Sequence, residues 1–367
     1  MIVAVDGYEL IRPVGGVGRV TESLLAETAP ILSEHEFRIF TRGESGGFPF
    51  PHVHEERIEP DRGYFWWQNG PLRKRLQTLT PDLLVAPNYW LPLFYRGKAL
   101  FILHDISFVA HPEWFSRKDA LKAKWLVKRS LEKAAAVVTV SEFSRSEILR
   151  YFPKTTSEKI KVVQHGVAED FQPAGREQTE QWKESKGFRG KTVVGFLGAI
   201  FNRRHVVELA EAVSLLRAEI PDVVLHVVGR DRTCPSLNLR ERLCQDWIRW
   251  DPGLPDEELS MFYSSLDVFA YPSTYEGFGL PPLEALASGT VPLLVDRTSL
   301  KEIYPDMAFM VNTTEPEILK EGLKAALTQR GRGQACLNRF LEKRAYYSWK
   351  RAGREFAEIL QVILNYS

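Results

Sequence analysis

Short apolar runs that alternate with segments of helical periodicity restrict the fold of this chain most strongly. The runs are rich in β-branched residues and are bounded by turn residues. They are Ile2–Val5, Leu83–Ala86, Ala99–Leu103, Val137–Val140, Val193–Leu197, Val223–Val228, Val268–Tyr271 and Val291–Val295. Such runs suit strands that are buried on both faces. Because helical segments lie between them, the order predicts an α/β fold of parallel, doubly wound sheets with helices on both faces.

The series of runs occurs twice, which predicts two domains. A length of 367 residues agrees with this, since domains usually contain roughly 100–200 residues. The polar stretch 169–189 separates the two series and is interpreted as a linker. We therefore predict one domain over residues 1–170, a second over 171–346, and a final amphipathic helix over 347–366 that packs back on the first domain. Ligands of such sheets bind at the carboxyl ends of the strands, so two facing domains leave a cleft for two substrates.

Composition excludes several classes of protein. Lys and Arg number 48 against 47 Asp and Glu, and this balance argues against a nucleic-acid partner. No apolar run reaches the roughly 18 residues of a transmembrane helix, and the first residues indicate a buried strand, not a signal peptide. The cysteines Cys234, Cys244 and Cys336 form no CxxC pair, which favours a reducing compartment. We expect a cytoplasmic protein.

The segment 268–296 carries the most chemical information. It begins with a predicted strand, and Pro281 and Pro282 then suit the first turn of a helix. The amides of Gly279 and Leu280 would stand at the N-terminus of this helix. Free amides at such a position bind anions, so the segment predicts an anion site.

Two carboxylates, Glu276 and Glu284, flank this anion site. We place Glu276 in the loop before the helix and Glu284 in the first helical turn. In that turn a carboxylate stabilises the helix by about 0.3–1 kcal/mol, and this alone would account for Glu284 but not for Glu276. Together, two carboxylates beside an anion site suit a sugar nucleotide, because they accept hydrogen bonds from sugar hydroxyls. The chain contains no D-x-D, so we expect no metal, and Arg, Lys and helix dipoles would neutralise a diphosphate.

Glu276 to Ala285, which read EGFGLPPLEA, resemble the E-x7-E signature of retaining nucleotide-sugar glycosyltransferases of family 4. Further stretches resemble motifs of the same family in the same order along the chain. They are GGVGR at 15–19, HD at 104–105, VSEFS at 140–144, VQHGV at 163–167 and GAIFNRRH at 198–205. The resemblance implies the GT-B fold, in which two Rossmann-like domains face each other across a cleft.

The resemblance also implies roles for individual residues. Arg203 and Arg204 would clamp the donor diphosphate and stabilise the leaving group. Glu276 would contact the donor sugar and Glu284 the ribose. The implied donor site comprises Arg203, Arg204, Gly229, Leu254, Glu276, Gly277, Phe278, Gly279, Leu280 and Glu284. Two positions depart from the family pattern: Asn202 stands where a proline is usual, and Arg204 where a lysine is usual.

Three residues of the first domain complete the predicted site. Gly15 and Gly16 follow the first strand and would lie beside the diphosphate and the acceptor, although a tight turn alone also explains glycine there. His104 stands at the end of a strand and matches the HD motif. It would donate or accept a hydrogen bond with the donor sugar, and the alternative is a purely structural histidine. We count His104, Glu276, Arg203 and Arg204 as the catalytic group.

The implied reaction is the transfer of a hexose from a nucleotide-diphosphate sugar to a glycan or lipid-linked acceptor, with retention and without a metal or other cofactor. Mannose or rhamnose is the expected sugar, since the GVGR loop and residues 65–68 look most like transferases for these sugars. Polysaccharide or O-antigen biosynthesis is the expected setting. A sugar-nucleotide epimerase or a phosphorylase on the same fold, and an inactive sugar-nucleotide-binding scaffold, are the alternatives.

Residues 114–136 form a basic segment with a candidate membrane function. Its cations are Arg117, Lys118, Lys122, Lys124, Lys128, Arg129 and Lys133, and its apolar stripe comprises Leu121, Trp125, Leu126 and Leu131. A helix of this kind docks on an anionic bilayer, where each cation contributes about 1 kcal/mol. The other interpretation is a solvated helix whose stripe packs on the domain core. The first interpretation predicts a peripheral protein on the cytoplasmic face of the membrane.

Overall fold

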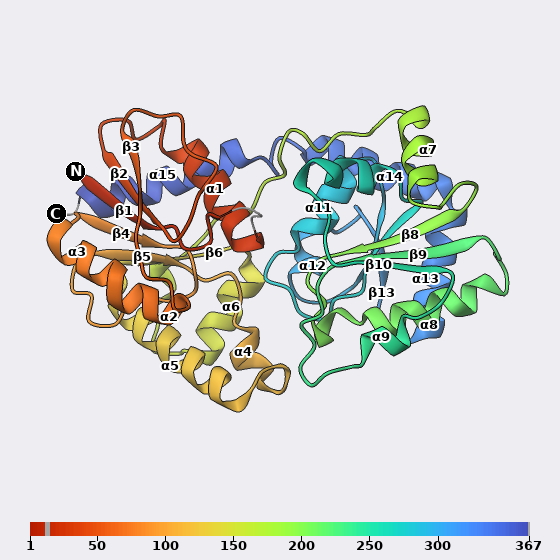
Figure 1. Ribbon diagram of the computed structural model, residues 1–367, viewed down its shortest axis with the longest axis horizontal. Coiled ribbons are helices and arrows are strands. Elements are labelled where there is room, and N and C mark those ends of the chain that lie inside the picture. The colour runs from red at the N-terminus through yellow and green to blue at the C-terminus, as the bar shows by residue number, and fades with distance from the viewer. Residues whose placement is uncertain (12–14, 366–367) are drawn as a thin grey trace. The chain divides into compact units, whose positions relative to one another are not determined.

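The computed structural model describes residues 1–11 and 15–365, and these form two compact units. The N-terminal unit comprises Met1–Ala110, Lys118–Gly166 and Tyr347–Ser367. The C-terminal unit comprises His111–Arg117 and Val167–Tyr346. The chain thus leaves the N-terminal unit after Gly166, a few residues before the boundary expected at 170. Figure 1 shows that each unit is a sheet with helices on both faces.

Within the described residues, the N-terminal unit has one parallel sheet of seven strands in the order β3-β2-β1-β4-β5-β6-β7. The strands are β1 (Ile2–Asp6), β2 (Glu36–Thr41), β3 (Val53–Arg57), β4 (Leu83–Ala86), β5 (Ala99–Ile102), β6 (Ala136–Thr139) and β7 (Ile160–Val162). In the register, Val3 lies opposite Phe37 on one side and Leu83 on the other. All three side chains are buried, as the apolar runs predict for central strands.

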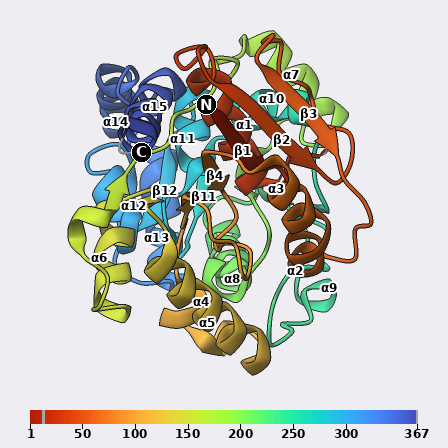
Figure 2. The same cartoon turned by 90° about the vertical axis from the view of Figure 1, so that its left-hand side faces the viewer.

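Helices cover this sheet on both faces (Figure 2). They are α1 (Gly16–Thr28), α2 (Tyr64–Trp67), the π-helical turn η1 (Gln68–Leu72), α3 (Arg73–Leu79), α4 (Ser107–Ala110), α5 (Arg117–Lys133), α6 (Glu142–Tyr151) and α15 (Trp349–Asn365), with the 3₁₀ turn η3 (Ser157–Lys159). The 3₁₀ turn η2 (Pro112–Trp114) belongs to the segment assigned to the C-terminal unit. The last helix, α15, packs on α1, and the Thr28 hydroxyl donates to Gly353 O at 3.1 Å. Residue 366, the last of the helix expected from the sequence, lies outside the described residues.

The C-terminal unit has a parallel sheet of six strands among the described residues, in the order β10-β9-β8-β11-β12-β13. The strands are β8 (Thr192–Leu197), β9 (Val223–Val228), β10 (Ile248–Asp251), β11 (Val268–Tyr271), β12 (Pro292–Val295) and β13 (Phe309–Val311). The helices and 3₁₀ turns are α7 (Arg176–Ser185), η4 (Asn202–Arg204), α8 (Val206–Arg217), α9 (Leu239–Arg242), η5 (Asp256–Glu258), α10 (Leu259–Ser264), α11 (Leu280–Ala287), α12 (Thr298–Ile303), α13 (Pro316–Thr328) and α14 (Arg330–Lys343). Both sheets confirm the predicted α/β architecture.

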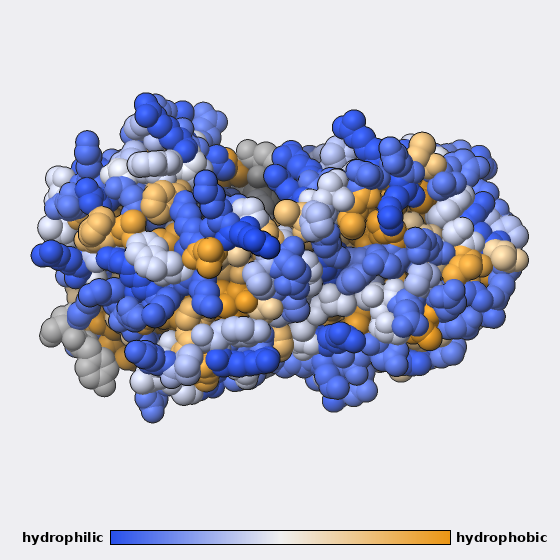
Figure 3. All heavy atoms as spheres, turned by 90° about the horizontal axis from the view of Figure 1, so that it is seen from below, coloured by the Kyte–Doolittle hydropathy of each residue, from blue (hydrophilic) through white to orange (hydrophobic). Residues whose placement is uncertain are grey.

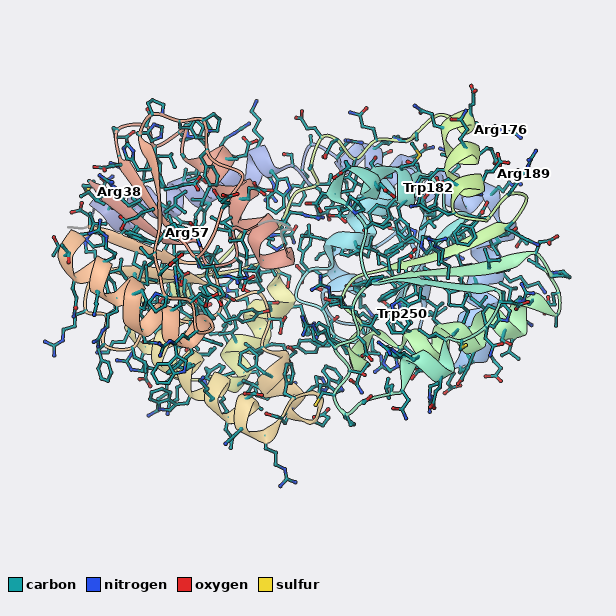
Figure 4. The ribbon with its side chains drawn as sticks, in the orientation of Figure 1. Arg38, Arg57, Arg176, Trp182, Arg189 and Trp250 are labelled. Atoms are coloured by element: carbon teal, nitrogen blue, oxygen red, sulfur yellow. The ribbon has the colours of Figure 1, made fainter. Side chains whose placement is uncertain are left out.

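The interpretation of 169–189 as a linker is wrong, because this stretch contains the helix α7. One aromatic residue, Trp182, anchors α7 to the C-terminal unit, with ring centroids 5.9 Å from His226 and 6.2 Å from Phe262. Figure 4 labels Trp182 on this helix, with Arg176 at its first residue and Arg189 in the loop that follows it. A helix with one apolar residue has the polar composition of a linker. A single tryptophan is a weak indication that such a stretch packs on a domain.

Candidate active site

Two glycines shape the carboxyl end of the C-terminal sheet. Gly198 follows β8 with a φ of 137°, and Gly229 follows β9 with a φ of 152°. A Cβ atom on Gly229 would lie 2.0 Å from Gly198 O, and a Cβ on Gly198 would lie 2.3 Å from Nη1 of Arg204. Only glycine permits both the backbone conformation and these close approaches. The two strands can therefore end side by side with an arginine laid across them.

Arg204 is that arginine, and it lies in a nearly closed environment. Its Nε donates to Oε1 of Glu276 at 3.1 Å, and its Nη1 donates to Ala199 O at 2.8 Å. The guanidinium carbon also lies 5.2 Å from the centre of the Tyr271 ring. The side chains of Arg204 and Glu276 are 12% and 9% exposed, so this is a buried ion pair.

Glu276 is held through one of its two carboxylate oxygens. Besides Arg204, the hydroxyls of Ser273 and Tyr271 donate to Oε1, at 2.8 and 3.0 Å. Oε2 accepts no hydrogen bond from the residues that the structure describes. Burial by itself would raise the pKa of Glu276, but Arg204, Arg203 and the Ser273 hydroxyl lower it below the usual value. The carboxylate is therefore ionised and presents one oxygen to a ligand.

Arg203 is buried as well, at 8% exposure, but without a carboxylate partner among the described residues. Its guanidinium lies over the Phe201 ring at 4.6 Å, and its Nε is a buried donor without a partner. Its carbonyl accepts from the Thr274 amide at 2.9 Å, which ties η4 to the loop before Glu276. A buried cation with an unused donor is suited to bind an anion.

Asn202 and His205 hold the same turn from its two ends. The Asn202 amide donates to Pro235 O at 3.0 Å and accepts from the Cys234 amide at 2.6 Å. His205 bonds Glu208 at 2.9 Å and the Thr274 hydroxyl at 3.2 Å. The asparagine that replaces the usual proline thus fixes the loop that follows β9.

The N-terminal end of α11 differs from the prediction in one respect. Gly279 adopts a φ of 89° and immediately precedes the helix, whose first residue is Leu280. Glu284 consequently lies in the second turn, so its predicted place in the first turn is wrong. It is 3% exposed and accepts from the Tyr263 hydroxyl at 2.8 Å. Its buried hydrogen bond, not the helix dipole, now accounts for a carboxylate at this position.

The other predicted donor-site residues lie around the same edge of the sheet. Ser299 of α12 donates to the carbonyls of Glu276 and Phe278, at 2.8 and 3.3 Å, and so fixes the loop that contains Gly277. Gly229 O accepts from the Trp250 indole at 2.8 Å, and Figure 4 labels this tryptophan beside the strands. Leu254 is half-buried in the loop after β10.

In the N-terminal unit, His104 follows β5 and its hydrogen bond determines its tautomer. Nε2 lies 2.9 Å from Pro87 O, and because a carbonyl only accepts, Nε2 is the protonated nitrogen. Burial lowers the pKa of His104 below its usual value, so the ring is neutral at pH 7. Nδ1 is then a hydrogen-bond acceptor. The rings of Tyr89 and His165 lie 5.6 and 6.1 Å away.

Gly15 and Gly16 begin α1, and the backbone itself does not demand glycine there. Gly15 has a φ of −77° and a ψ of 175°, which any residue adopts. No atom of the described residues lies within 4 Å of a Cβ built on either glycine. Contacts with the described residues therefore do not require glycine at either position, and a role of the two glycines in ligand binding stays a prediction.

A buried polar cluster at the end of β1 was missed by the sequence analysis. Asp6 accepts from the Tyr64 hydroxyl at 3.0 Å, from the Gln68 amide at 3.1 Å and from the Tyr8 amide at 3.2 Å. Burial raises the pKa of Asp6 to about 6. The available signal was an acidic residue directly after the first apolar run, at a strand end where ligands bind. The described residues contain no group of three or more His, Cys, Asp or Glu side chains that would hold a metal ion.

Two family models match the chain in succession. The model described as Glycosyltransferase Family 4 matches residues 14–171, and the model described as Glycosyl transferases group 1 matches residues 178–345. The chain is a family 4-like glycosyltransferase with the GT-B fold. The family and the fold predicted from the motifs are thereby confirmed. No described helix of this glycosyltransferase is long and apolar enough to cross a membrane.

Similar proteins include two mannosyltransferases of Escherichia coli. O-antigen chain mannosyltransferase B is 26% identical over 72% of this chain and 70% of its own length. Serotype-specific mannosyltransferase WbdA is 25% identical over 95% of this chain but only 46% of its own length. Among solved structures, Anabaena HepE in complex with UDP-glucose superposes with a TM-score of 0.75, at 18% identity, over 98% of this chain and 99% of that one. This last likeness shows the fold alone.

Proposed function

We propose that this glycosyltransferase moves a hexose, with mannose as the first candidate, from a nucleotide-diphosphate sugar to a glycan or lipid-linked acceptor in O-antigen or related polysaccharide synthesis. One observation carries the proposal. Glu276 is ionised and accepts its hydrogen bonds through Oε1, so Oε2 has none among the described residues. Arg203, whose charge acts on the same carboxylate, has a buried Nε donor without a partner. The likeness to mannosyltransferases supports the choice of sugar, and the UDP-glucose complex of HepE supports a nucleotide-sugar donor.

In the proposed site, Arg203 binds the donor diphosphate and stabilises the charge that develops as it leaves. Arg204 holds Glu276 in place and adds positive charge. Glu276 contacts the sugar through Oε2, and Nδ1 of His104 accepts a hydrogen bond from a sugar hydroxyl. The amides of Gly279 and Leu280 contact the phosphate, and Glu284 contacts the ribose.

The proposed reaction retains the anomeric configuration and uses no metal. The bond from the anomeric carbon to the diphosphate oxygen breaks, and a bond to the acceptor oxygen forms on the same face of the sugar. The acceptor proton passes to the departing diphosphate. Two arginines near the phosphate supply the cationic charge that a metal ion provides elsewhere.

Thermal unfolding in EDTA with GDP, UDP, TDP, ADP and their mannose or glucose derivatives tests donor binding. A ligand at about 100 times its dissociation constant adds about 2.7 kcal/mol of stability, which a melt detects. We expect one nucleotide to raise the melting temperature and Arg203→Ala to abolish the shift. Arg176→Ala, an exposed arginine on α7, is the matched control and should retain it. No shift with any nucleotide would contradict the proposed donor site.

Product analysis separates transfer from the alternatives. A nucleotide sugar and an acceptor sugar incubated together should give a disaccharide whose anomeric configuration, read by the one-bond C1–H1 coupling in NMR, matches that of the donor. An inverted product would contradict retention. Isomerisation of the donor without an acceptor would indicate an epimerase. Cleavage of a glycoside that depends on phosphate would indicate a phosphorylase, and binding of the donor without any product would indicate an inactive scaffold. Arg203→Ala should lower turnover by on the order of 10²–10³.

We also propose that α5 docks this glycosyltransferase on an anionic membrane. The single apolar stripe expected along residues 114–136 is wrong, because it divides between two faces. Leu126 and Leu131 are 1% and 3% exposed in the core, whereas Leu121 and Trp125 are 70% and 54% exposed. Figure 3, seen from the side where α5 lies in Figure 1, shows hydrophobic side chains scattered among hydrophilic ones. Exposed apolar residues between cations are typical of helices in the membrane interface.

Vesicle flotation tests the membrane proposal. Wild-type protein should float with vesicles that contain an anionic lipid and not with neutral ones, and salt should weaken the binding. Leu121→Ser with Trp125→Ser should reduce flotation without lowering the melting temperature, because both side chains are exposed. Equal flotation of the double variant would contradict docking through α5.

A further inference from the structure

Residues 91–97, which connect β4 to β5, form a loop that is tied down on both sides. The Leu91 amide donates to the Ser130 hydroxyl of α5 at 2.9 Å. The Leu93 amide donates to the side chain of Asn69, in η1, at 2.6 Å. Loop 91–97 is therefore fixed between α5 on one side and η1, which continues into α3, on the other.

Phe94 stands at the centre of this loop in an unusual position. Its φ is 64°, in the left-handed region that a bulky side chain rarely adopts, and its ring is 69% exposed. The guanidinium carbons of Arg73 and Arg129 lie 6.0 and 5.7 Å from the ring centre. Strained residues of this kind concentrate at functional sites. The exposed ring thus stands between two arginines from two different helices.

Two pockets adjoin the loop and share the residues from Phe94 to Gly97. One, of about 500 Å³, is also lined by Arg73, and the other, of about 470 Å³, by Arg129 and Lys133. Arg96 lines both, and no carboxylate lines either pocket. None of these four cations forms an ion pair within the part of the chain that the structure describes. The pockets are therefore strongly cationic and unneutralised.

Two residues that line the first pocket have buried donor atoms without partners. Nε of Arg73 and the hydroxyl of Tyr95 are both buried without a hydrogen bond, and both residues line the first pocket. Burial raises the pKa of Tyr95 to about 12, so the phenol is protonated and available as a donor. Buried donors are normally satisfied, and a ligand with several acceptor oxygens would satisfy these.

We propose that the pockets beside loop 91–97 bind the phosphate group of an anionic lipid, with Phe94 placed against the apolar part of that lipid. Guanidinium groups together with a phenol match a phosphate, whose oxygens accept several hydrogen bonds at once. A lipid is favoured over a free phosphate ion because the exposed Phe94 ring lies among the cations. The neighbouring α2 adds Trp66, which is 68% exposed, and Lys122 of α5 lies 3.8 Å from the Phe65 ring beside it. The inference deepens the membrane docking proposed above and rests on it.

Flotation with vesicles of equal surface charge tests the lipid-phosphate site. One set contains phosphatidic acid, which carries a phosphate monoester, and the other contains a fatty acid, which carries a carboxylate. Wild-type protein should bind the phosphatidic acid vesicles at least about tenfold more tightly, since a bidentate charge-assisted pair is stronger and more specific than simple charge attraction. Arg73→Gln with Arg96→Gln should remove this preference. Lys74→Gln with Lys128→Gln removes the same charge from exposed lysines of α3 and α5 and should leave the preference intact.

The results of these flotation experiments distinguish the lipid-phosphate site from the proposed membrane docking and from the proposed donor site. Equal preference in the two double variants, or no preference in the wild type, would overturn the lipid-phosphate site. No binding of the wild type to any anionic vesicle would overturn membrane docking and this inference with it. Glycerol phosphate, added at the same concentration as the lipid phosphate, competes for the pockets without an apolar part. If it removes the preference for phosphatidic acid, the assignment to a lipid is overturned. Both double variants should still show the rise in melting temperature that the nucleotide causes. Absence of this rise in the wild type would contradict the donor site and leave the lipid-phosphate site untouched.

Phe94→Gly provides a second variant that should fold. Glycine accepts the positive φ without strain, so the loop should keep its conformation. We expect the preference for phosphatidic acid to persist and the overall affinity for vesicles to fall, because only the apolar contact is removed. Unchanged affinity would overturn the role given to the ring.

Discussion

At the scale of single residues, the buried pair of Arg204 and Glu276 is the central feature of the proposed donor site. The two side chains form a buried ion pair, so removal of either one takes away a compensating charge in a low-dielectric environment. The pair also fixes which oxygen of Glu276 remains available. Arg203, by contrast, has no such partner and is the cation that a diphosphate would meet.

Glu276→Gln tests this division of roles. The substitution removes the carboxylate charge opposite the buried Arg204, so the free energy of unfolding should fall by about 3–5 kcal/mol, and turnover should fall with it. Denaturant titration with and without saturating nucleotide measures the first effect. Arg203→Ala, which breaks no ion pair, should cost little stability in the absence of nucleotide. Equal losses in the two variants would contradict the assignment.

His104 gives a second prediction at this scale. Protonation would turn Nδ1 from an acceptor into a donor, but the lowered pKa of His104 keeps the ring neutral as the pH falls below 6.5. In His104→Asn the side-chain oxygen can occupy the place of Nδ1 and does not titrate. Wild type and His104→Asn should therefore show the same dependence of turnover on pH near 6.5. His104→Ala should lower turnover at every pH. A titration step at pH 6.5 that the Asn variant abolishes would contradict a neutral acceptor.

At the scale of elements, the contact between α1 and α15 depends on a glycine. A Cβ on Gly353 would lie 2.3 Å from Cβ of Glu27, so the two helices approach more closely than any other residue permits. The last helix of the chain, α15, thereby becomes part of the N-terminal unit, although the residues of the C-terminal unit lie between α1 and α15 in the sequence.

Gly353→Ala tests how tightly these helices pack. The added methyl group overpacks the contact, and the free energy of unfolding should fall by about 1–3 kcal/mol. Gly333→Ala on α14 is the matched control, because its Cβ would meet Val291 at an ordinary 3.6 Å. Alanine favours a helix over glycine by up to about 1 kcal/mol, so the control should be neutral or stabilising. Chemical denaturation monitored by circular dichroism compares them, and a stable Gly353→Ala protein would refute the close contact.

At the scale of the whole molecule, buried titratable groups make stability depend on pH. Burial lowers the pKa of His226 to about 4, although the hydrogen bond to Asp251 at 2.8 Å opposes the shift. The unfolded chain then binds the proton more strongly than the folded one between the two pKa values. Stability is complete above pH 6.5 and decreases as the pH falls toward 4. Asp6 acts in the opposite direction, because its raised pKa favours the folded state as the pH falls through about 6.

The pH dependence can be assigned by substitution. From about pH 7 to about pH 4, His226 should account for a loss on the order of 3 kcal/mol in the free energy of unfolding. His226→Gln should flatten this part of the profile while lowering stability at neutral pH, because the ring fills an apolar site beside Phe188 and Phe262. Denaturant titrations across this range measure both effects. A variant with the same slope as the wild type would show that other groups cause it.

The strands missed from the sequence illustrate where local patterns fail. Five strands of the described residues have no counterpart among the eight apolar runs, and four of them, β3, β7, β10 and β13, lie at an edge of their sheet. An edge strand is covered on fewer sides, so its sequence need not be apolar: β3 reads Val-His-Glu-Glu-Arg. Pairing with the neighbouring strand supplies its stability, and that pairing is not encoded in the strand's own periodicity. The helix α7 was missed because Trp182 is its one apolar residue, so its sequence shows no helical repeat of apolar positions.

Local sequence patterns were enough to predict the parallel α/β architecture, its repetition and the glycosyltransferase family, because buried central strands and glycine-rich turns leave strong signals along the chain. They also show which residue types stand at the strand ends, including His104, Arg203, Arg204 and Glu276. How these groups divide their hydrogen bonds and charges became visible in the folded structure alone. The ion pair of Arg204 with Glu276 joins residues 72 positions apart, and the two arginines near the Phe94 ring come from two separate helices. Hydrogen bonds and charges act through space, so their partners are set by the fold and not by neighbours along the chain.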